Sequence, residues 1–294
     1  MKKVLITGAT GLIGRSLITF FQQEKKYEVY VVTTNKKKLL GYENINIVEG
    51  DLKDSYFRKQ IIESVTPEVL VHLAWDQTRP DFRQSNENLR WLDISIDLLY
   101  SFIESRGKRF IFAGSSSEYD AEKGTFRENS LAKATSKYGQ CKRCFTELAQ
   151  CYCKDQCSFV SLRYFTVFGE NDTHSFGAIP EAVRKLKNDE EVVCNSPFTT
   201  RDYIYAQDAA EITYKMIESS FEGILNVASG KAYTMAEVFR IIGEALGKEG
   251  LVKINWTNKE KNEFNADITL LESLNLIGTT MSFEERIASI IEKY

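Results

Sequence analysis

The sequence predicts a doubly wound parallel α/β sheet followed by a smaller, mostly C-terminal lobe. Strand-like and helix-like segments alternate through the first half of the chain, and the strand-like segments are almost continuous apolar runs. Strands of that kind are buried on both faces, as in a parallel sheet with helices on each side. After Arg163 the alternation gives way to loops, short strands and helices, without a clear linker. With 294 residues the chain can bury a large core.

Ten segments build the expected sheet domain. Residues 12–23 illustrate the helical pattern, because Leu12, Ile13, Leu17 and one of Phe20 and Phe21 fall on one side. Residues 28–33 are rich in β-branched side chains, which favour strands. On such grounds we expect strands over 3–7, 28–33, 45–48, 69–73, 109–113 and 159–162, and helices over 12–23, 56–64, 86–104 and 134–154.

The second half is expected to be less regular. Helical patterns cover 178–187, 206–217, 235–246 and 283–293, and short strands are expected near Val192 and Tyr203. We expect two lobes that share a cleft. The first lobe comprises residues 1–165, with 201–228 folding back onto it, and the second comprises 166–200 and 229–294.

Composition excludes several classes of protein. The net charge of −3 and the mixed signs argue against a nucleic-acid-binding protein, which usually carries a basic stripe. No apolar run approaches the roughly 20 residues of a membrane span. The apolar start breaks at Thr7-Gly8 with no cleavage site after it, so it reads as a strand and the protein is expected to be cytoplasmic.

Five of the six cysteines lie between residues 141 and 157. The sequence argues against a zinc site there, since that stretch is predicted to be one helix and the only histidines are His72 and His174. We expect reduced, half-buried thiols and no metal.

A glycine-rich turn follows the first predicted strand and opens the first predicted helix. It reads Gly8-x-x-Gly11-x-x-Gly14. Glycine removes the Cβ atoms that would keep the backbone away from a pyrophosphate, and a helix N-terminus offers free N–H donors. The position of the turn predicts a dinucleotide site in a Rossmann-type fold, and the alternative is an ordinary tight turn.

This spacing, directly after Ile6-Thr7, resembles that of the extended short-chain dehydrogenase/reductase family, whose cofactor is NAD or NADP. In that family a carboxylate after the second strand would hold the ribose of NAD. Here Thr34-Asn35 is followed by Lys36-Lys37-Lys38, and Arg15 follows Gly14. Cations without a carboxylate favour binding of the 2′-phosphate of NADP(H), and NAD(H) is the alternative cofactor. The lysines could also simply form a solvent-exposed turn with no role in binding.

The resemblance implies a set of residues that contact the cofactor. They are Gly8, Thr10, Gly11, Leu12, Ile13, Gly14, Thr34, Asn35, Lys36, Asp51, Leu52, Leu73, Ala74, Trp75, Tyr138 and Lys142.

The candidate catalytic pair is Tyr138-x-x-x-Lys142, which places both side chains on one helix face. A nearby ammonium would lower the pKa of the phenol and allow proton exchange with an alcohol or carbonyl oxygen. The pair alone could be a surface helix pair. Upstream, Gly114 to Tyr119 resembles the family's S-S-x-x-x-Y segment, and counting back from Tyr119 implies Ser115 as the catalytic serine, or Ser116 if the register shifts by one. The resemblance further implies that Ser115 orients the substrate oxygen and that Lys142 binds the nicotinamide ribose.

Two segments of the second half resemble the family branch that acts on nucleotide sugars. Residues 162–169 resemble R-x-F-N-V-Y-G-P, with Thr166 for Asn and Phe168 for Tyr, and residues 200–208 resemble R-D-Y-I-H-V-x-D. The second lobe would therefore bind substrate. Arg201 would bind its pyrophosphate, unless it forms a structural salt bridge with Asp202 or Asp208. The implied substrate residues are Ser116, Tyr164, Thr166 and Arg201, with Lys259 or Lys261 in place of a second arginine.

The sequence lacks residues that two other reactions of the branch require. Ser116 and Ser117 stand where 4,6-dehydratases of the branch carry Asp-Glu, and Ser117 where fucose-synthase-like enzymes carry Cys. Three segments, 88–92, 117–120 and 138–142, resemble those of a subgroup of deoxysugar or heptose reductases. The resemblance implies a role in the synthesis of such sugars or of surface polysaccharides.

We therefore expect a 4-ketoreductase, or the reverse dehydrogenase, acting at C4 of a nucleotide-linked sugar. The alternatives are a C4 epimerase with tightly bound NAD and a non-catalytic dinucleotide sensor. By analogy with the family, a homodimer is expected through a four-helix bundle of helices 88–104 and 138–152.

Overall fold

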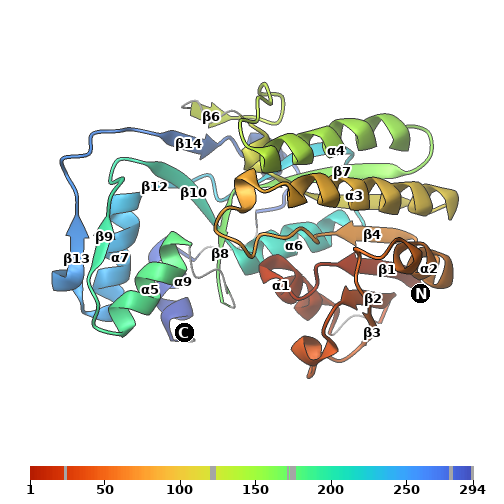
Figure 1. Ribbon diagram of the computed structural model, residues 1–294, viewed down its shortest axis with the longest axis horizontal. Helices are drawn as coiled ribbons and strands as arrows, with labels where there is room; N and C mark the ends of the chain where they lie inside the picture. The colour runs from red at the N-terminus through yellow and green to blue at the C-terminus, as the bar shows by residue number, and fades with distance from the viewer. Residues whose placement is uncertain (23–24, 120–123, 171, 173–176, 278–280, 293–294) are drawn as a thin grey trace. The chain divides into compact units, whose positions relative to one another are not determined.

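The computed structural model describes residues 1–22, 25–119, 124–170, 172, 177–277 and 281–292 (Figure 1). The chain divides into two compact units. Unit 1 comprises Met1–Asp120, Leu131–Tyr164 and Ala210–Leu225. Unit 2 comprises Ala121–Ser130, Phe165–Ala209 and Asn226–Tyr294. In this division residues 210–225 group with unit 1, whereas 201–209 and 226–228 group with unit 2.

Unit 1 is built on a seven-stranded sheet with the order β11-β7-β5-β4-β1-β2-β3. The neighbouring strands from β7 to β3 all pair in parallel; β1 aligns Val4 with Val29 of β2 and with Val69 of β4. This confirms the predicted parallel sheet. The strands are β1 (Lys2–Thr7), β2 (Tyr27–Thr33), β3 (Ile45–Glu49), β4 (Val69–His72), β5 (Arg109–Ser115), β7 (Ser158–Tyr164) and β11 (Gly223–Val227).

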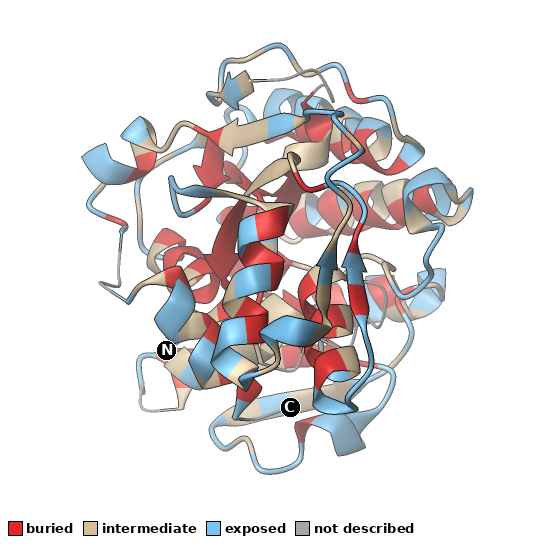
Figure 2. Ribbon diagram, turned by 90° about the vertical axis from the view of Figure 1, so that its left-hand side faces the viewer, coloured by how far each residue is buried: buried red, intermediate tan, exposed pale blue. Residues whose placement is uncertain are grey.

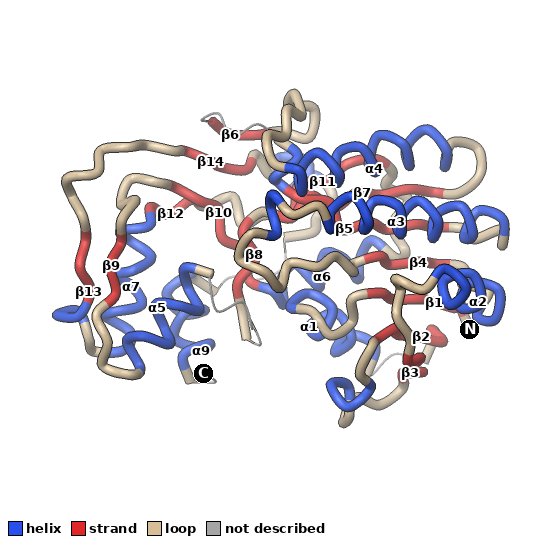
Figure 3. The backbone as a smooth tube through the Cα atoms, in the orientation of Figure 1, coloured by secondary structure: helices blue, strands red, loops and turns tan. Residues whose placement is uncertain are grey.

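Helices cover both faces of this sheet (Figure 3). On one face the apolar sides of α2, α3 and α4 pack on buried strand residues such as Leu70, Phe110 and Phe112. On the other face α1 meets α6, where Phe20 stacks on Tyr214 at 5.5 Å between ring centroids. The helices are α1 (Leu12–Phe21), α2 (Ser55–Val65), α3 (Glu87–Glu104), α4 (Lys137–Cys153) and α6 (Ala206–Met216). In Figure 2 the buried residues gather on the strands and on the inward helix faces.

Helix ends differ slightly from the sequence prediction. Helix α4 begins at Lys137 and not at residue 134, because Ser136 is its N-cap and accepts a hydrogen bond from the Gly139 N–H at 3.0 Å. Helix α1 ends at Phe21, two residues before the predicted end, which lies outside the described residues.

Unit 2 contains a five-stranded sheet of order β12-β10-β14-β6, with β8 pairing to β10, and a two-stranded sheet of β13 and β9. Its helices are α5 (Ala178–Lys187), α7 (Met235–Leu246), α8 (Thr269–Ser273) and α9 (Phe283–Ile291). Val183 of α5, Ile242 of α7 and Ile287 of α9 belong to one hydrophobic core. The strands are β6 (Gly124–Phe126), β8 (Thr166–Phe168), β9 (Val192–Cys194), β10 (Thr200–Tyr205), β12 (Ala232–Thr234), β13 (Val252–Ile254) and β14 (Glu263–Ala266).

In the part of the chain that the structure describes, no helix combines the length and the apolar character that a membrane crossing requires.

Candidate active site

The glycine turn between β1 and α1 brings the backbone close to the end of β4. Gly8 has φ +72, and a Cβ at this position would lie 2.6 Å from the backbone nitrogen of Ala74. A Cβ at Gly14 would lie 2.3 Å from the carbonyl oxygen of Gly8. Helix α1 starts from Gly11 without a side-chain cap. The turn is thus a backbone-lined cradle at a helix N-terminus, which fits the pyrophosphate of a dinucleotide.

The lysines expected after β2 lie near an unexpected carboxylate, that of Glu49 at the end of β3. Thr34, Asn35 and Lys36 are exposed, and the Asn35 side chain accepts a hydrogen bond from the Lys37 N–H at 3.0 Å. Glu49 ends the neighbouring strand β3, and its carboxylate lies 3.8 Å from the Lys36 ammonium. Both side chains are more than a third exposed, so the attraction between them is weak. The parallel pairing of Thr33 with Glu49 is what brings this carboxylate here.

The remaining predicted cofactor residues lie along the same edge of the sheet. Leu73 and Ala74 follow β4, and their N–H groups donate to the backbone and side-chain oxygens of Thr7 at 3.2 and 3.3 Å. Leu52 is buried, whereas Asp51 is exposed and accepts a hydrogen bond from the Lys53 N–H. These positions follow the carboxyl ends of β1, β3 and β4, where ligands of open α/β sheets bind.

Ser115 and Tyr138 meet at the end of β5. Tyr138 is buried, and the Ser115 side chain lies near enough to its hydroxyl group to favour the ionised phenol. The contact depends on Gly139, because a Cβ at residue 139 would lie 1.9 Å from the carbonyl oxygen of Ser117. Only glycine lets α4 come this close to the 3-10 helix η3 (Ser116–Glu118). Ser116 is the first residue of η3 and is partly exposed.

Lys142 lies one helical turn after Tyr138 and is 1% exposed. Its ammonium donates to the carbonyl oxygen of Ala113 at 2.6 Å. It also lies 4.0 Å from the ring centroid of Trp75 and 4.6 Å from that of Phe112. Burial lowers the pKa of Lys142 to about 7. The aromatic rings and the carbonyl oxygen contact the amine, and the loss of water around it makes its proton easier to lose than that of an exposed lysine.

The predicted shift of the Tyr138 pKa is wrong in its direction. We expected the Lys142 ammonium to lower the pKa of the phenol, but burial raises that pKa to about 12. The opposing, smaller effects come from the nearby Ser115 hydroxyl, the positive charge of Arg83 and a hydrogen bond from Gln77. Sequence spacing reveals a neighbouring cation but not the loss of water around the phenol, and here the second effect dominates.

Sequence reasoning missed two polar residues near the phenol, Gln77 and Arg83. The Gln77 amide donates to the Tyr138 hydroxyl oxygen at 2.8 Å. Arg83 donates to the Ser117 hydroxyl at 2.8 Å. Both belong to the segment after β4, and the rule that ligands gather at carboxyl strand ends could have pointed to them.

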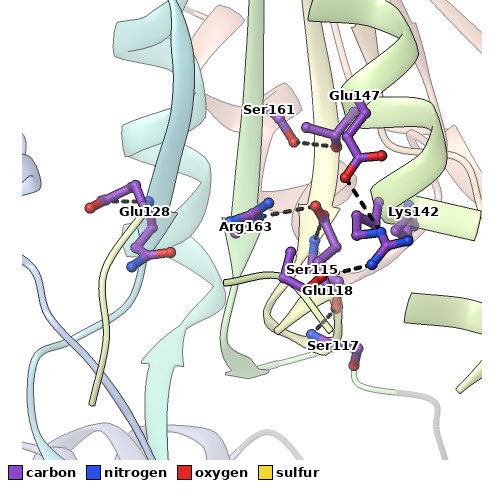
Figure 4. A network of polar contacts seen from close by, with 12 residues as sticks. Ser115, Ser117, Glu118, Glu128, Lys142, Glu147, Ser161 and Arg163 are labelled. Atoms are coloured by element: carbon purple, nitrogen blue, oxygen red, sulfur yellow. Dashed lines mark hydrogen bonds and ion pairs between the residues drawn. The ribbon is translucent and has the colours of Figure 1, made fainter. Parts of the chain in front are cut away.

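A buried ion pair supports the Ser115 backbone (Figure 4). Glu118 is fully buried, and its two carboxylate oxygens accept from the Ser115 N–H at 2.8 Å and from Arg163 Nε at 3.0 Å. The Arg163 guanidinium lies 4.5 Å from the centroid of the Tyr119 ring. Burial raises the pKa of Glu118, and the charge of Arg163 opposes this shift. This pair was not anticipated from the sequence.

The predicted substrate residues fall in different units. In unit 1, Tyr164 is buried and its hydroxyl hydrogen-bonds Thr213 at 2.7 Å. In unit 2, Thr166 is exposed on β8, and Arg201 donates to the Thr200 carbonyl at 2.7 Å and to the Asn262 side chain at 3.2 Å. The Arg201 guanidinium also lies 5.7 Å from the centroid of the Phe264 ring.

Asp202 and Asp208 are the two aspartates that could form a salt bridge with Arg201, and the structure gives each of them the following partners. Asp202 accepts from the N–H groups of Ser229 and Gly230, each at 2.8 Å, and Asp208 pairs with Arg286 at 2.7 Å. Burial raises the pKa of Asp202 to about 6. Of the two proposed lysines, Lys261 is exposed and Lys259 lies 5.3 Å from the centroid of the Phe198 ring.

All six cysteines are free thiols. Among the residues that the structure describes, no cluster of three or more His, Cys, Asp or Glu side chains could hold a metal ion.

Comparison with known proteins agrees with this geometry. The sequence model of the NAD dependent epimerase/dehydratase family matches residues 4–228. The chain belongs to this family. It is therefore an NAD(P)-dependent enzyme, as the glycine turn and the tyrosine–lysine pair predict.

Individual relatives are distant. CDP-abequose synthase of Salmonella muenchen is 28% identical over 254 residues, which cover 82% of this chain and 80% of that protein. GDP-6-deoxy-D-talose 4-dehydrogenase of Aggregatibacter actinomycetemcomitans is 22% identical over 253 residues, which cover 82% and 79%. Among solved structures, the UDP-N-acetylglucosamine 4-epimerase of Methanobrevibacter ruminantium M1 matches with a TM-score of 0.87, 24% identity and coverage of 99% and 97%. The last match concerns the fold alone.

Proposed function

We propose that the protein is an oxidoreductase that transfers hydride between NAD(P)(H) and C4 of a nucleotide-linked sugar. The observation that carries the proposal is the position of Ser115 beside Tyr138 at the carboxyl end of β5, with the buried Lys142 one helical turn further along α4. Further support comes from the names of two relatives, a CDP-abequose synthase and a GDP-6-deoxy-D-talose 4-dehydrogenase. The direction, 4-keto reduction or alcohol oxidation, depends on which cofactor form and sugar are supplied. We place this reaction in the synthesis of deoxysugars, heptoses or surface polysaccharides.

Each residue has a role in this reaction. The bound nicotinamide supplies or accepts the hydride at C4. Tyr138 donates its proton to the keto oxygen during reduction and takes it back during oxidation. Ser115 hydrogen-bonds the same oxygen and orients it. Lys142, held on the Ala113 carbonyl, binds the nicotinamide ribose, and the glycine turn holds the pyrophosphate through backbone N–H groups.

The decisive assay combines purified protein with candidate 4-keto-sugar nucleotides and NADPH. Stoichiometric loss of NADPH absorbance supports the reductase, whereas turnover with no member of a broad panel would refute it and favour a sensor. Tyr138→Phe is expected to abolish turnover while cofactor affinity stays unchanged. Tyr56→Phe, at an exposed tyrosine of α2, is the matched control. An active Tyr138→Phe enzyme would contradict the mechanism.

A C4 epimerase is the second candidate, because several solved structures with this fold are described as 4-epimerases. An epimerase would retain NAD through purification and interconvert two sugar nucleotides without net consumption of cofactor. Denaturing the purified protein and analysing the released nucleotide separates this outcome from the reductase.

We further propose that NADP(H) is the preferred cofactor, with NAD(H) as the alternative. The support is the exposed Lys36 at the end of β2, although Glu49 lies 3.8 Å from its ammonium. Lys36→Gln should weaken NADPH binding by about tenfold and leave NADH binding unchanged, since one charge-assisted phosphate contact contributes about 1.5 kcal/mol. Lys59→Gln, at an exposed lysine of α2, serves as the control. Tighter binding of NADH than NADPH to the unmodified protein would overturn the preference.

For the substrate, we propose that Arg201 binds the pyrophosphate of the sugar nucleotide. Phe264 and Asn262 position its guanidinium within unit 2. Arg201→Lys keeps the charge but loses the planar guanidinium, which can bind two phosphate oxygens at once. We therefore expect kcat/KM to fall while cofactor affinity is unchanged. A variant that loses thermal stability but keeps KM would identify a structural arginine.

We also propose a homodimer through α3 and α4. Leu89, Tyr100 and Tyr152 on these helices are more than 60% exposed, although each is a large apolar side chain. Sedimentation equilibrium should give a dimer for the unmodified protein and a monomer for Leu89→Glu combined with Tyr100→Glu. A monomeric unmodified protein would refute this.

A further inference from the structure

The segment between β4 and α3 covers the phenol of Tyr138 from several directions. Gln77 donates its side-chain N–H to the hydroxyl oxygen at 2.8 Å. The rings of Phe82 and Trp75 meet the Tyr138 ring edge-on, at centroid distances of 5.3 and 6.1 Å. Gln77 and Trp75 are partly buried. One loop thus supplies both the apolar walls and a polar contact at the reacting oxygen.

The direction of the Gln77 hydrogen bond determines its chemical effect. An amide N–H that donates to a phenol oxygen leaves the phenol's own proton free for another acceptor. It also stabilises the phenolate more than the phenol, because hydrogen bonds to an ionised acceptor are stronger. Gln77 therefore favours loss of the proton that Tyr138 must give to the substrate.

Arg83 adds a positive charge on the same side. Its guanidinium donates to the Ser117 hydroxyl at 2.8 Å and lies 5.3 Å from the centroid of the Phe82 ring, which itself packs on Tyr138. Its charge favours the ionised form of the phenol.

Lys142 contributes differently. Its ammonium is directed to the Ala113 carbonyl and to the faces of Trp75 and Phe112, and it lies 5.7 Å from the Tyr138 ring centroid. The loop, and not the helix that carries the motif, therefore supplies the amide donor at the phenol oxygen.

We propose that Gln77 is a further catalytic residue, which donates a hydrogen bond to the Tyr138 oxygen and stabilises the phenolate formed during proton transfer, with Arg83 as an electrostatic positioning residue. The inference rests on the proposed reaction. In the reduction, the reduced nicotinamide gives its hydride to the keto carbon and becomes oxidised. The O–H bond of Tyr138 breaks, its proton goes to the sugar oxygen, and the electron pair remains on the phenol oxygen beside Gln77.

The test compares Gln77→Met and Gln77→Glu with a control, Gln84→Met, at an exposed glutamine of the same loop. Gln77→Met should lower kcat by about tenfold or more, since a hydrogen bond to a charged group contributes about 1.5–3 kcal/mol. The limb of the pH profile that reports the phenol should move upward by about one unit. Arg83→Met should move it upward by less, because Arg83 is exposed to solvent. Gln84→Met should change neither quantity.

A second measurement avoids turnover altogether. Chlorotyrosine incorporated at position 138 has a more acidic phenol, whose ionisation is followed by absorbance in the folded protein, with circular dichroism as the check on folding. Gln77→Met should raise the pKa of this phenol, and Gln77→Glu should raise it further because a carboxylate repels the phenolate.

An unchanged or lower pKa in Gln77→Met would overturn the inference, because the amide would then not act as a donor. A raised pKa in a protein that turns over no sugar nucleotide would support the contact and refute the proposed function alone.

Discussion

Replacing His72 with glutamine tests how burial controls ionisation in the centre of the parallel sheet. The imidazole is completely buried at the end of β4, with Nδ1 2.7 Å from the Thr7 hydroxyl and Nε2 2.9 Å from the Ser95 hydroxyl. The Phe112 ring stacks on it at 5.9 Å. Burial, and to a lesser extent the charge of Lys142, lowers the pKa of His72 to about 3.

The size of the effect follows from proton linkage. Above pH of about 6.5, the ordinary pKa of histidine, His72 is neutral in both the folded and the unfolded protein. Below it, the unfolded chain binds a proton that the folded protein does not bind until the pH reaches about 3. The free energy of unfolding therefore falls with decreasing pH, by about 1.4 kcal/mol per unit from this residue. Between pH 6.5 and 5 the loss is about 2 kcal/mol.

Urea unfolding of the unmodified protein and of His72→Gln at several pH values between about 7.5 and 5 measures this loss. Glutamine keeps polar atoms near Thr7 and Ser95 but cannot titrate. The variant should show the shallower dependence of unfolding free energy on pH, by about 1.4 kcal/mol per unit. A constant offset between the two proteins leaves the difference in slope unaffected, and His174 is common to both. Parallel pH dependences would refute the reasoning.

Three further predictions concern the site. Gly14→Ala should destabilise unit 1 by about 1–3 kcal/mol and weaken dinucleotide binding, measured by urea unfolding and cofactor titration, because its Cβ would lie 2.3 Å from the Gly8 carbonyl. Glu118→Ala should cost about 3–5 kcal/mol in unfolding free energy, whereas Glu118→Leu combined with Arg163→Met should cost less, since it leaves no unpaired buried charge. Equal losses would contradict this. Trp75→Ala should raise the pKa of Lys142 above about 7, as followed by NMR of ¹³C-labelled lysine, because water reaches the ammonium.

The parallel sheet could be predicted because its order depends on patterns that are local in the sequence. Apolar runs, glycine positions and helical periodicity identified the strands and helices of unit 1 within a few residues, except for β11, which was not expected. Short strands of unit 2 were expected near Val192 and Tyr203, where β9 and β10 lie, but others, such as β14, could not be predicted in this way. Strand β14 pairs Phe264 with Gly124, so its existence depends on a partner about 140 residues away.

The residues of the site likewise divide into those that a sequence motif identifies and those that only the folded chain brings together. Ser115 and Tyr138 were recognised because their spacing is distinctive. Gln77 was missed, because a single glutamine in a loop has no pattern, and its role depends on a 2.8 Å contact formed only in the folded chain. The raised pKa of Tyr138 also follows from burial, which the motif does not reveal.

The close approach at Gly139 also limits how such an enzyme can diverge. Any side chain at this position requires η3 to move away from α4, since a Cβ would lie 1.9 Å from the Ser117 carbonyl oxygen. That movement would carry Ser115 away from Tyr138, even though both residues remained in the sequence. A directed-evolution library for new sugar substrates should therefore keep position 139 fixed, keep Gln77 as well, and vary the other positions of the loop between β4 and α3, where no such backbone constraint joins the catalytic serine to its tyrosine.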